Sequence, residues 1–145
     1  MIPLFFCYFL FFGATVNAIR PDKEIIKEFL DASRAAIKLE NNDDVPELFH
    51  ENFEFKTCKE ERYNKEQTVD YIIDTLNPDD YNATRLTAID RPSMANGIVF
   101  DVIIDGITDE PTYAEFIMTE DEQNKVWKLL RGTETTCPID IPLNG

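Results

Sequence analysis

The chain has 145 residues and carries 28 acidic against 14 basic side chains, a formal net charge of −14. That length suits one domain with a substantial core and leaves no room for a second. So negative a charge disfavours nucleic acid and anionic membrane surfaces as partners, because both would repel the protein.

The first 18 residues contain no Lys, Arg, Asp or Glu. Leu4 to Phe12 is a nearly unbroken apolar run, and small or modest side chains precede Ile19 at the spacing that signal peptidase requires. The sequence therefore predicts a signal peptide over residues 1–18 and a secreted, extracellular protein with a single domain over residues 19–145. An uncleaved anchor is the alternative, although a membrane span needs roughly 20 apolar residues.

Helical patterns dominate the first half of the remaining chain. Residues 22–40 place apolar side chains at helical spacing with acids in the first turn, which predicts an amphipathic helix of about five turns. A short helix is predicted over residues 44–50, with Asp44 opening a capping box. A third helix begins at an Asn64 cap, carries an apolar stripe from Val69 to Leu76 and ends at an Asn-Pro pair.

Extended patterns surround and follow the third helix. Residues 53–58 alternate aromatic and charged side chains, which predicts a short strand, and a polar link runs through residues 59–62. Four later segments rich in β-branched and aromatic residues predict an antiparallel meander: 81–90, 97–105, 112–119 and 125–131. Both faces of 97–105 are partly apolar, so we expect the sheet to be covered on both sides or folded around something. The fold class is α+β.

Two cysteines, Cys58 and Cys137, remain once Cys7 is removed with the leader. In an oxidising compartment an isolated pair is most simply one disulfide, and closing so long a loop stabilises a fold by about 4 kcal/mol. A redox-active pair and an intermolecular bridge are the alternatives, but neither a Cys-x-x-Cys motif nor a surplus thiol supports them. The sequence therefore predicts a disulfide between Cys58 and Cys137.

Asn82-Ala83-Thr84 is an N-glycosylation sequon. Together with the signal peptide and the neighbouring Asn77–Asp80 loop, it makes Asn82 the expected site of a surface glycan. An unmodified strand residue is the alternative, because many sequons remain unused.

The chain orders its elements as long helix, short helix, strand, helix and four antiparallel strands. Within that order, Phe29–Ile37 is similar to a recurring opening helix, Val45–Phe55 to a short helix with the first strand, and Val126–Leu129 to a last strand. The order and these passages, over residues 22–137, resemble the nuclear transport factor 2-like fold, also called SnoaL-like or ketosteroid-isomerase-like, and in particular its small secreted members. The resemblance implies a cone-shaped fold with N-terminal helices packed on a curved antiparallel sheet.

The same resemblance implies an apolar pocket at the open end of the cone and an outer sheet face that often forms a homodimer. Enzymatic members place an Asp, Tyr or His in the pocket to move a proton beside a carbonyl, which makes Asp101, Asp105, Tyr113, Glu115 and His50 the catalytic candidates. The alternative for the strand residues is a solvent-facing role, since alternate strand positions are polar on an exposed face. The alternative for His50 is to complement the dipole at the end of the short helix.

No metal site, cofactor site or covalent nucleophile is expected. With one histidine and a paired cysteine couple, a His-rich metal centre or a Cys/His pair is excluded, and the acidic clusters lack the spacing of a calcium loop. The two serines, Ser33 and Ser93, stand in no nucleophile elbow, and no glycine-rich phosphate loop is present.

These observations predict a secreted binding module for a small apolar ligand or an extracellular protein partner, with no catalytic machinery required. The alternative is a SnoaL-like isomerase or hydrolase that uses an Asp or Glu base in the cone pocket. A cystatin-like inhibitor shares the size and the helix-plus-sheet class, but the chain lacks the Gln-x-Val-x-Gly loop of that family. Nucleic acid and, after signal cleavage, membranes are not expected as partners.

Overall fold

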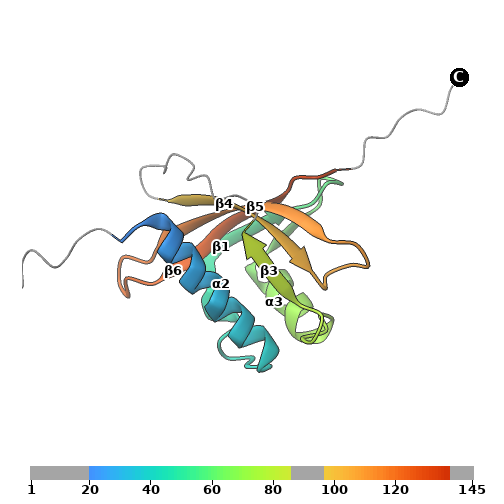
Figure 1. The fold of residues 1–145 in the computed structure, drawn as a ribbon, viewed down its shortest axis with the longest axis horizontal. Coiled ribbons are helices and arrows are strands. Elements are labelled where there is room, and N and C mark those ends of the chain that lie inside the picture. The colour runs from blue at the N-terminus through green and yellow to red at the C-terminus, as the bar shows by residue number, and fades with distance from the viewer. Residues whose placement is uncertain (1–19, 86–96, 138–145) are drawn as a thin grey trace, which may run out of the picture.

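The computed structural model of the chain describes residues 20–85 and 97–137 (Figure 1). Its elements are, in chain order, α2 (Asp22–Lys38), the 3-10 helix η1 (Pro46–Leu48), β1 (Phe49–Lys56), β2 (Arg62–Asn64), α3 (Lys65–Asp74), β3 (Asn82–Arg85), β4 (Ile98–Asp105), β5 (Thr112–Glu120) and β6 (Trp127–Glu134). The predicted signal peptide over residues 1–18 and the second half of the strand predicted over 81–90 lie outside the described residues.

Six strands form one sheet in the order β2-β1-β6-β5-β4-β3. The last four strands in the chain pair antiparallel in succession, which confirms the predicted meander. β1 instead lies parallel to β6, with Phe55 opposite Gly132, so the expectation of a wholly antiparallel sheet is wrong. Parallel neighbours need a long crossover, and most of the domain lies between these two strands. Both helices lie on one side of this mixed sheet, which confirms the α+β class (Figure 1).

The buried face of the sheet packs against α2. Along β4 every second side chain, from Ile98 to Ile104, is buried, whereas the alternating positions are half-buried or exposed. α2 adds the buried stripe that its periodicity predicts, formed by Ile25, Ile26, Phe29, Leu30, Ser33, Ala36 and Ile37. Of the two arrangements expected for the sheet, the structure has the second, because the sheet bends around α2 and no described helix covers its other face (Figure 1).

A row of aromatic rings fills the buried face. Phe55 of β1 and Phe116 of β5 flank Gly132 of β6, with ring centroids 6.2 Å apart. A Cβ atom at Gly132 would lie 2.6 Å from a ring carbon of each, closer than real contacts allow. Phe100 of β4 continues the row at 5.9 Å from Phe116. The glycine in the middle of β6 is therefore a packing requirement of the core.

The short helix predicted over residues 44–50 is only a 3-10 turn of three residues. Asp44 does not cap it, and the Asp44 carboxylate instead accepts a bond from Asn41 Nδ2 at 2.7 Å. Glu47, expected to complete the capping box, instead reaches Lys128 Nζ on β6 at 3.3 Å. Both polar side chains therefore have other partners, and the helix is not extended.

β1 begins at Phe49, four residues before the strand predicted over 53–58. His50 therefore lies within a strand, and its predicted place at the end of a helix is wrong. Phe49 pairs with Leu129 of β6, and the burial of both side chains outweighs the weak helical preference of this segment. The pairing becomes irregular just after Phe49, where the Asn52 N–H donates to His50 Nδ1 at 3.1 Å.

α3 begins with the predicted cap. Asn64 Oδ1 accepts a bond from the Gln67 N–H at 2.9 Å, and Gln67 Oε1 accepts one from the Asn64 N–H at 3.0 Å, which closes a capping box. The end of the predicted polar link forms β2 instead, an exposed edge strand paired with β1 through Tyr63 and Phe55. Three exposed residues have no burial pattern, so sequence periodicity could not predict β2.

A disulfide joins Cys58 to Cys137, as predicted from the sequence, with 5.3 Å between their Cα atoms. It links the turn after β1 to the residues that follow β6, and the Cys58 N–H also donates to Glu134 Oε2 at 3.0 Å. The crosslink therefore fastens the parallel pair of β1 and β6 at the end where Lys56 stands opposite Thr133.

Replacing both Cys58 and Cys137 by serine is expected to lower the free energy of unfolding by about 4 kcal/mol, because the crosslink closes a separation of 79 residues in the unfolded chain. Urea unfolding followed by circular dichroism measures the difference from the oxidised parent. The reduced parent is the control and should unfold together with the variant. Unchanged midpoints in both samples would contradict a stabilising role for the disulfide.

Candidate functional site

Four of the predicted catalytic residues, those on β4 and β5, lie on one face of the sheet, the face turned away from the helices. Asp101 of β4 stands directly opposite Glu115 of β5, and Tyr113 follows two residues away, opposite Ile103. All three are half-buried and alternate with the buried core side chains of their strands. Their period-two spacing fits either face equally well, which is why the sequence could not place them. The structure does not bring them to a cavity beneath α2.

The other two candidates are Asp105 and His50. Asp105 lies on the same face as this group, exposed at the end of β4 and opposite Asn82 of the edge strand β3. His50 lies apart from it. His50 is half-buried on β1, and its Nδ1 accepts the local bond from Asn52. The five predicted catalytic residues therefore do not converge on one site.

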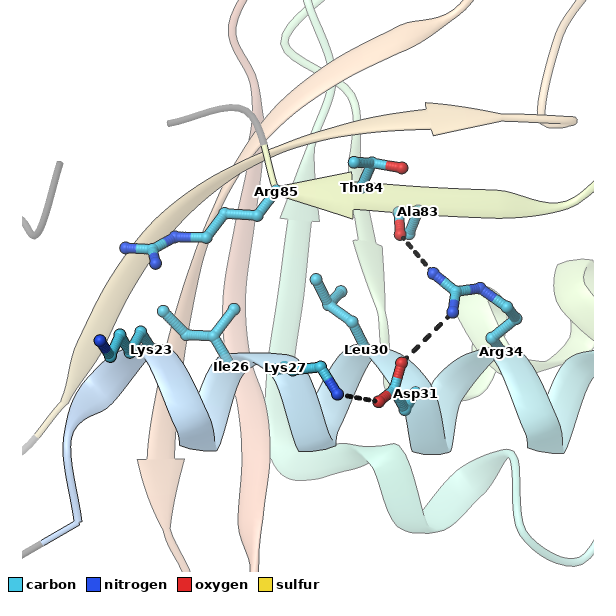
Figure 2. A pocket seen from close by; sticks show the side chains of 9 residues that line it. All are labelled: Lys23, Ile26, Lys27, Leu30, Asp31, Arg34, Ala83, Thr84 and Arg85. Carbon is cyan, nitrogen blue, oxygen red and sulfur yellow. Dashed lines mark hydrogen bonds and ion pairs between the residues drawn. The ribbon is translucent and has the colours of Figure 1, made fainter. Parts of the chain in front are cut away.

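A groove of about 190 Å³ opens between α2 and β3 (Figure 2). Its floor is apolar, because Ile26 and Leu30 point from α2 toward β3, where Ala83 lies, and all three are buried. Its rim carries five charged side chains: Lys23, Lys27, Asp31, Arg34 and Arg85. Four of these five are cations, in a chain with 28 acidic and only 14 basic residues. The groove thus combines apolar surface with positive charge.

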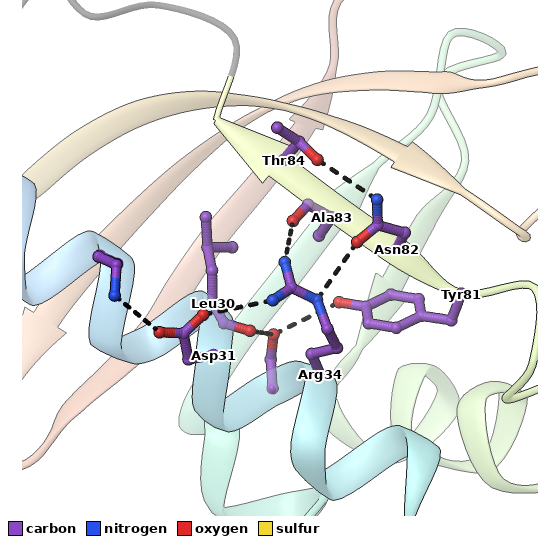
Figure 3. A network of polar contacts seen from close by, with 9 residues as sticks. Leu30, Asp31, Arg34, Tyr81, Asn82, Ala83 and Thr84 are labelled. Carbon is purple, nitrogen blue, oxygen red and sulfur yellow. Dashed lines mark hydrogen bonds and ion pairs between the residues drawn. The ribbon is translucent and has the colours of Figure 1, made fainter.

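Arg34 holds one end of the groove (Figure 3). Its guanidinium donates through Nε to Asn82 Oδ1 at 3.2 Å, through Nη2 to the Ala83 carbonyl at 3.2 Å and through Nη1 to Asp31 at 3.3 Å. Lys27 Nζ reaches the other carboxylate oxygen of Asp31, also at 3.3 Å. Because β3 is an edge strand, the bond from Arg34 satisfies a carbonyl that no further strand pairs with. This network ties α2 to β3 beside the groove.

Asn82, the predicted glycosylation site, is half-buried at the start of β3. Its Nδ2 atom, to which a glycan would be attached, donates to Thr84 Oγ1 at 3.4 Å. Its Oδ1 atom accepts the bond from Arg34. Since Arg34 and Thr84 both line the groove, the sequon lies along the groove rim (Figure 3).

Tyr81 and Ser33 form a buried polar contact next to this network. Their hydroxyl oxygens are 3.5 Å apart, and Ser33 Oγ donates to the Leu30 carbonyl at 2.8 Å, which leaves the Tyr81 hydroxyl as the donor to Ser33. Burial raises the pKa of Tyr81 above its ordinary value of about 10, although the bond with Ser33 and the charge of Arg34 oppose the shift. Tyr81 is therefore a neutral donor at physiological pH.

Neither helix within the described ranges, 20–85 and 97–137, is long and apolar enough to span a membrane. No three histidine, cysteine, aspartate or glutamate side chains in them are grouped so that they could hold a metal ion. The acids Asp44 and Asp80 instead accept bonds from the asparagines three residues earlier, at 2.7 and 2.9 Å, within turns.

The sequence model of the NTF2-like domain family matches residues 23–139. The chain belongs to the NTF2-like domain family. This confirms the nuclear transport factor 2-like resemblance drawn from the order of the elements. No curated protein matches the NTF2-like chain in sequence.

Solved structures share the fold of this NTF2-like domain. An NTF2-like protein from Cytophaga hutchinsonii has a TM-score of 0.60 at 14% identity, covering 81% of this chain and 99% of that chain. An NTF2-like protein of unknown function in nutrient uptake from Rhodospirillum rubrum has a TM-score of 0.60 at 18% identity, covering 78% and 98%. A putative Ca/calmodulin-dependent kinase II association domain from Exiguobacterium sibiricum has a TM-score of 0.59 at 14% identity, covering 86% and 99%. At such identities the similarity concerns the fold alone.

The charged residues of the groove are not among the sites predicted from the sequence. Lys23 and Lys27 are one helical turn apart, and Arg34 lies about two turns further along the same stripe of α2, so a sequence signal exists for three of the four cations. Arg85 carries no such signal, because only the packing of β3 against α2 places it beside them.

The buried Tyr81 is expected to make the protein less stable at high pH. The unfolded chain loses the Tyr81 proton near pH 10, whereas the raised pKa keeps the folded protein protonated at that position. The unfolded state then binds fewer protons than the folded state, so the free energy of unfolding falls as the pH rises above about 10. Tyr81→Phe should remove this part of the fall, measured by denaturant unfolding at several pH values from about 8 to 11.

Tyr63→Phe is the matched control for this pH dependence. A bond to Glu61 Oε2 at 2.7 Å raises the pKa of Tyr63 as well, but that pair is exposed and screened by solvent. Removing the Tyr63 hydroxyl should change the slope of the free energy of unfolding against pH less than Tyr81→Phe does. Loss of the Tyr81 hydroxyl also changes the free energy of unfolding by an amount that does not depend on pH. The same slope in the parent and in Tyr81→Phe would contradict the buried, neutral role of Tyr81.

Proposed function

We propose that the protein is a secreted binding module that holds a small ligand, apolar in part, in the groove between α2 and β3. The observation that carries this proposal is how the groove is built. Ile26, Leu30 and Ala83 form an apolar floor, and Arg34 ties the two walls together beside it. Ligand sites in proteins commonly combine an apolar lining with a few positioned polar groups.

The placement of the acids favours a binding role over the alternative of an isomerase or hydrolase. Such an enzyme needs a carboxylic acid and a donor that converge on one reacting atom. Asp101, Tyr113 and Glu115 share the outer face of the sheet, on the far side from the groove. The acid at the groove, Asp31, is engaged by Lys27 and Arg34.

Secretion is part of the proposal. The uncharged apolar segment over residues 1–18 supports it, and so does the disulfide between Cys58 and Cys137, since such bonds persist in oxidising compartments. In that compartment Asn82 becomes an acceptor for an N-linked glycan, which would grow from the rim of the groove.

Native mass spectrometry of the protein secreted from a eukaryotic host tests the proposal. The expected result is a chain that begins at Ile19, carries the mass of a glycan at Asn82 and retains a small molecule that denaturation releases. A mass that still includes residues 1–18 would overturn the secretion, and a chain that emerges empty would overturn the ligand-binding role.

Lys27→Trp is expected to reduce the retained ligand several-fold, because an indole ring at this exposed rim position would cover the groove. Lys38→Trp is the matched control, since this exposed lysine of the same helix lies outside the groove lining. The two variants are compared by the amount of ligand released per mole of protein. Equal retention in both would place the ligand elsewhere in the molecule.

A further inference from the structure

We infer that Asn82 accepts its glycan only while the chain is unfolded, and that the docking of α2 against β3 closes the acceptor site. Arg34 of α2 closes it, because its guanidinium donates both to the Asn82 side chain and to the backbone of the next residue. This inference rests on the glycan proposed for Asn82 and defines when that glycan can be attached.

Glycan transfer uses the side-chain amide nitrogen of Asn82 as a nucleophile. A bond forms between Asn82 Nδ2 and the anomeric carbon of the first sugar, and the bond from that carbon to the pyrophosphate of a lipid-linked oligosaccharide breaks. Nδ2 gives up one of its two hydrogens as a proton, and the lipid pyrophosphate leaves. The transferase must therefore reach Nδ2 from solvent and find its lone pair available.

In the folded domain both polar atoms of the Asn82 amide are engaged (Figure 3). Oδ1 accepts the bond from Arg34 Nε at 3.2 Å, and Nδ2 donates to Thr84 Oγ1 at 3.4 Å. A positively charged donor on the amide oxygen strengthens the conjugation between the nitrogen lone pair and the carbonyl, which makes Nδ2 a weaker nucleophile. Asn82 is also half-buried. The folded domain therefore presents a poor acceptor.

The backbone of the sequon is held from two sides. In the pairing of β3 with β4, Asn82 stands opposite Asp105 and Ala83 opposite Ile104. On the other side of β3, Arg34 Nη2 donates to the Ala83 carbonyl at 3.2 Å. Drawing the sequon into the active site of an enzyme would break these contacts and expose the buried side chains of Ala83 and Ile104. Transfer to the folded domain therefore requires β3 to open first.

The finished glycan is compatible with the fold. Attachment replaces one hydrogen of Asn82 Nδ2, so the other can still be donated to Thr84, and Oδ1 can still accept from Arg34. β4 follows Asn82 in the chain, so a newly made sequon has no strand to pair with until β4 is also made. Modification therefore precedes folding, and a chain that folds without the glycan keeps its acceptor closed.

Glycosylation in vitro of the mature chain, produced unmodified in bacteria and oxidised, tests the inference. One sample stays folded, and the other is reduced, alkylated at its cysteines and shown by circular dichroism to be unfolded. Both are incubated with microsomal oligosaccharyltransferase and its lipid-linked donor, and mass spectrometry follows the gain at Asn82. The unfolded chain is expected to react at least about tenfold faster, because the folded chain reacts only through its open fraction. Equal rates would overturn the inference.

Arg34→Ala isolates the contribution of the docked helix. It releases Asn82 Oδ1 and the Ala83 carbonyl but leaves the sequon intact, so the folded variant should react several-fold faster than the folded parent. Lys38→Ala is the matched control, since this exposed lysine of α2 forms no hydrogen bond with β3 in the described structure. Circular dichroism confirms that both variants are folded. Equal rates in the two variants would overturn the role of Arg34, and the comparison of folded with unfolded parent does not depend on either.

The outcomes separate this inference from the proposed function. A short peptide with an Asn-Ala-Thr sequon confirms that the transferase is active. If the peptide reacts and neither form of the chain does, both the inference and the proposed glycan are wrong. Rapid transfer to the folded chain would overturn the inference alone and leave the glycan in place. The binding role of the groove is tested separately by Lys27→Trp and is unaffected by either result.

Discussion

The parallel pairing of β1 with β6 is the contact on which the rest of the structure depends. It attaches the part of the chain that carries α2 and α3 to the meander formed by the later strands. Across this pair the rings of Phe55 and Phe116 meet over Gly132, and the disulfide from Cys58 to Cys137 fastens its end. Because the pairing orients the two parts, it decides which face of the sheet α2 covers and where a groove can form.

The groove follows from the edge of the sheet. β3 is the last strand, so α2 lies beside backbone groups that have no further strand to pair with. Arg34 donates to the Ala83 carbonyl there, and this contact both protects the edge and brings a cation to the rim. The opposite face of the sheet carries Asp101 and Glu115, away from the helices. A shared NTF2-like fold does not select a function, and the difference between these two surfaces is the basis of the binding role proposed above.

The sequence by itself determined the features that rest on local patterns. The periodicity of α2 and of the meander is visible because a buried stripe repeats at the period of its own element. The capping box of Asn64 and Gln67 is visible because both partners lie within one helical turn. The pairing of Cys58 with Cys137 is visible because these are the cysteines that remain after the leader. These features, with the order of the elements, were enough to predict the α+β class and the family.

Only the tertiary structure decided which surfaces meet. His50 lies in a strand and not at a helix end, because Phe49 finds its partner on β6. Asp101 and its neighbours point away from α2, since an alternating pattern is the same on either face until a helix covers one of them. The groove is likewise a product of the tertiary structure, because Arg85 lies beside the cations of α2 only where the edge strand packs there. That contact joins segments far apart in the chain, and no local pattern encodes it.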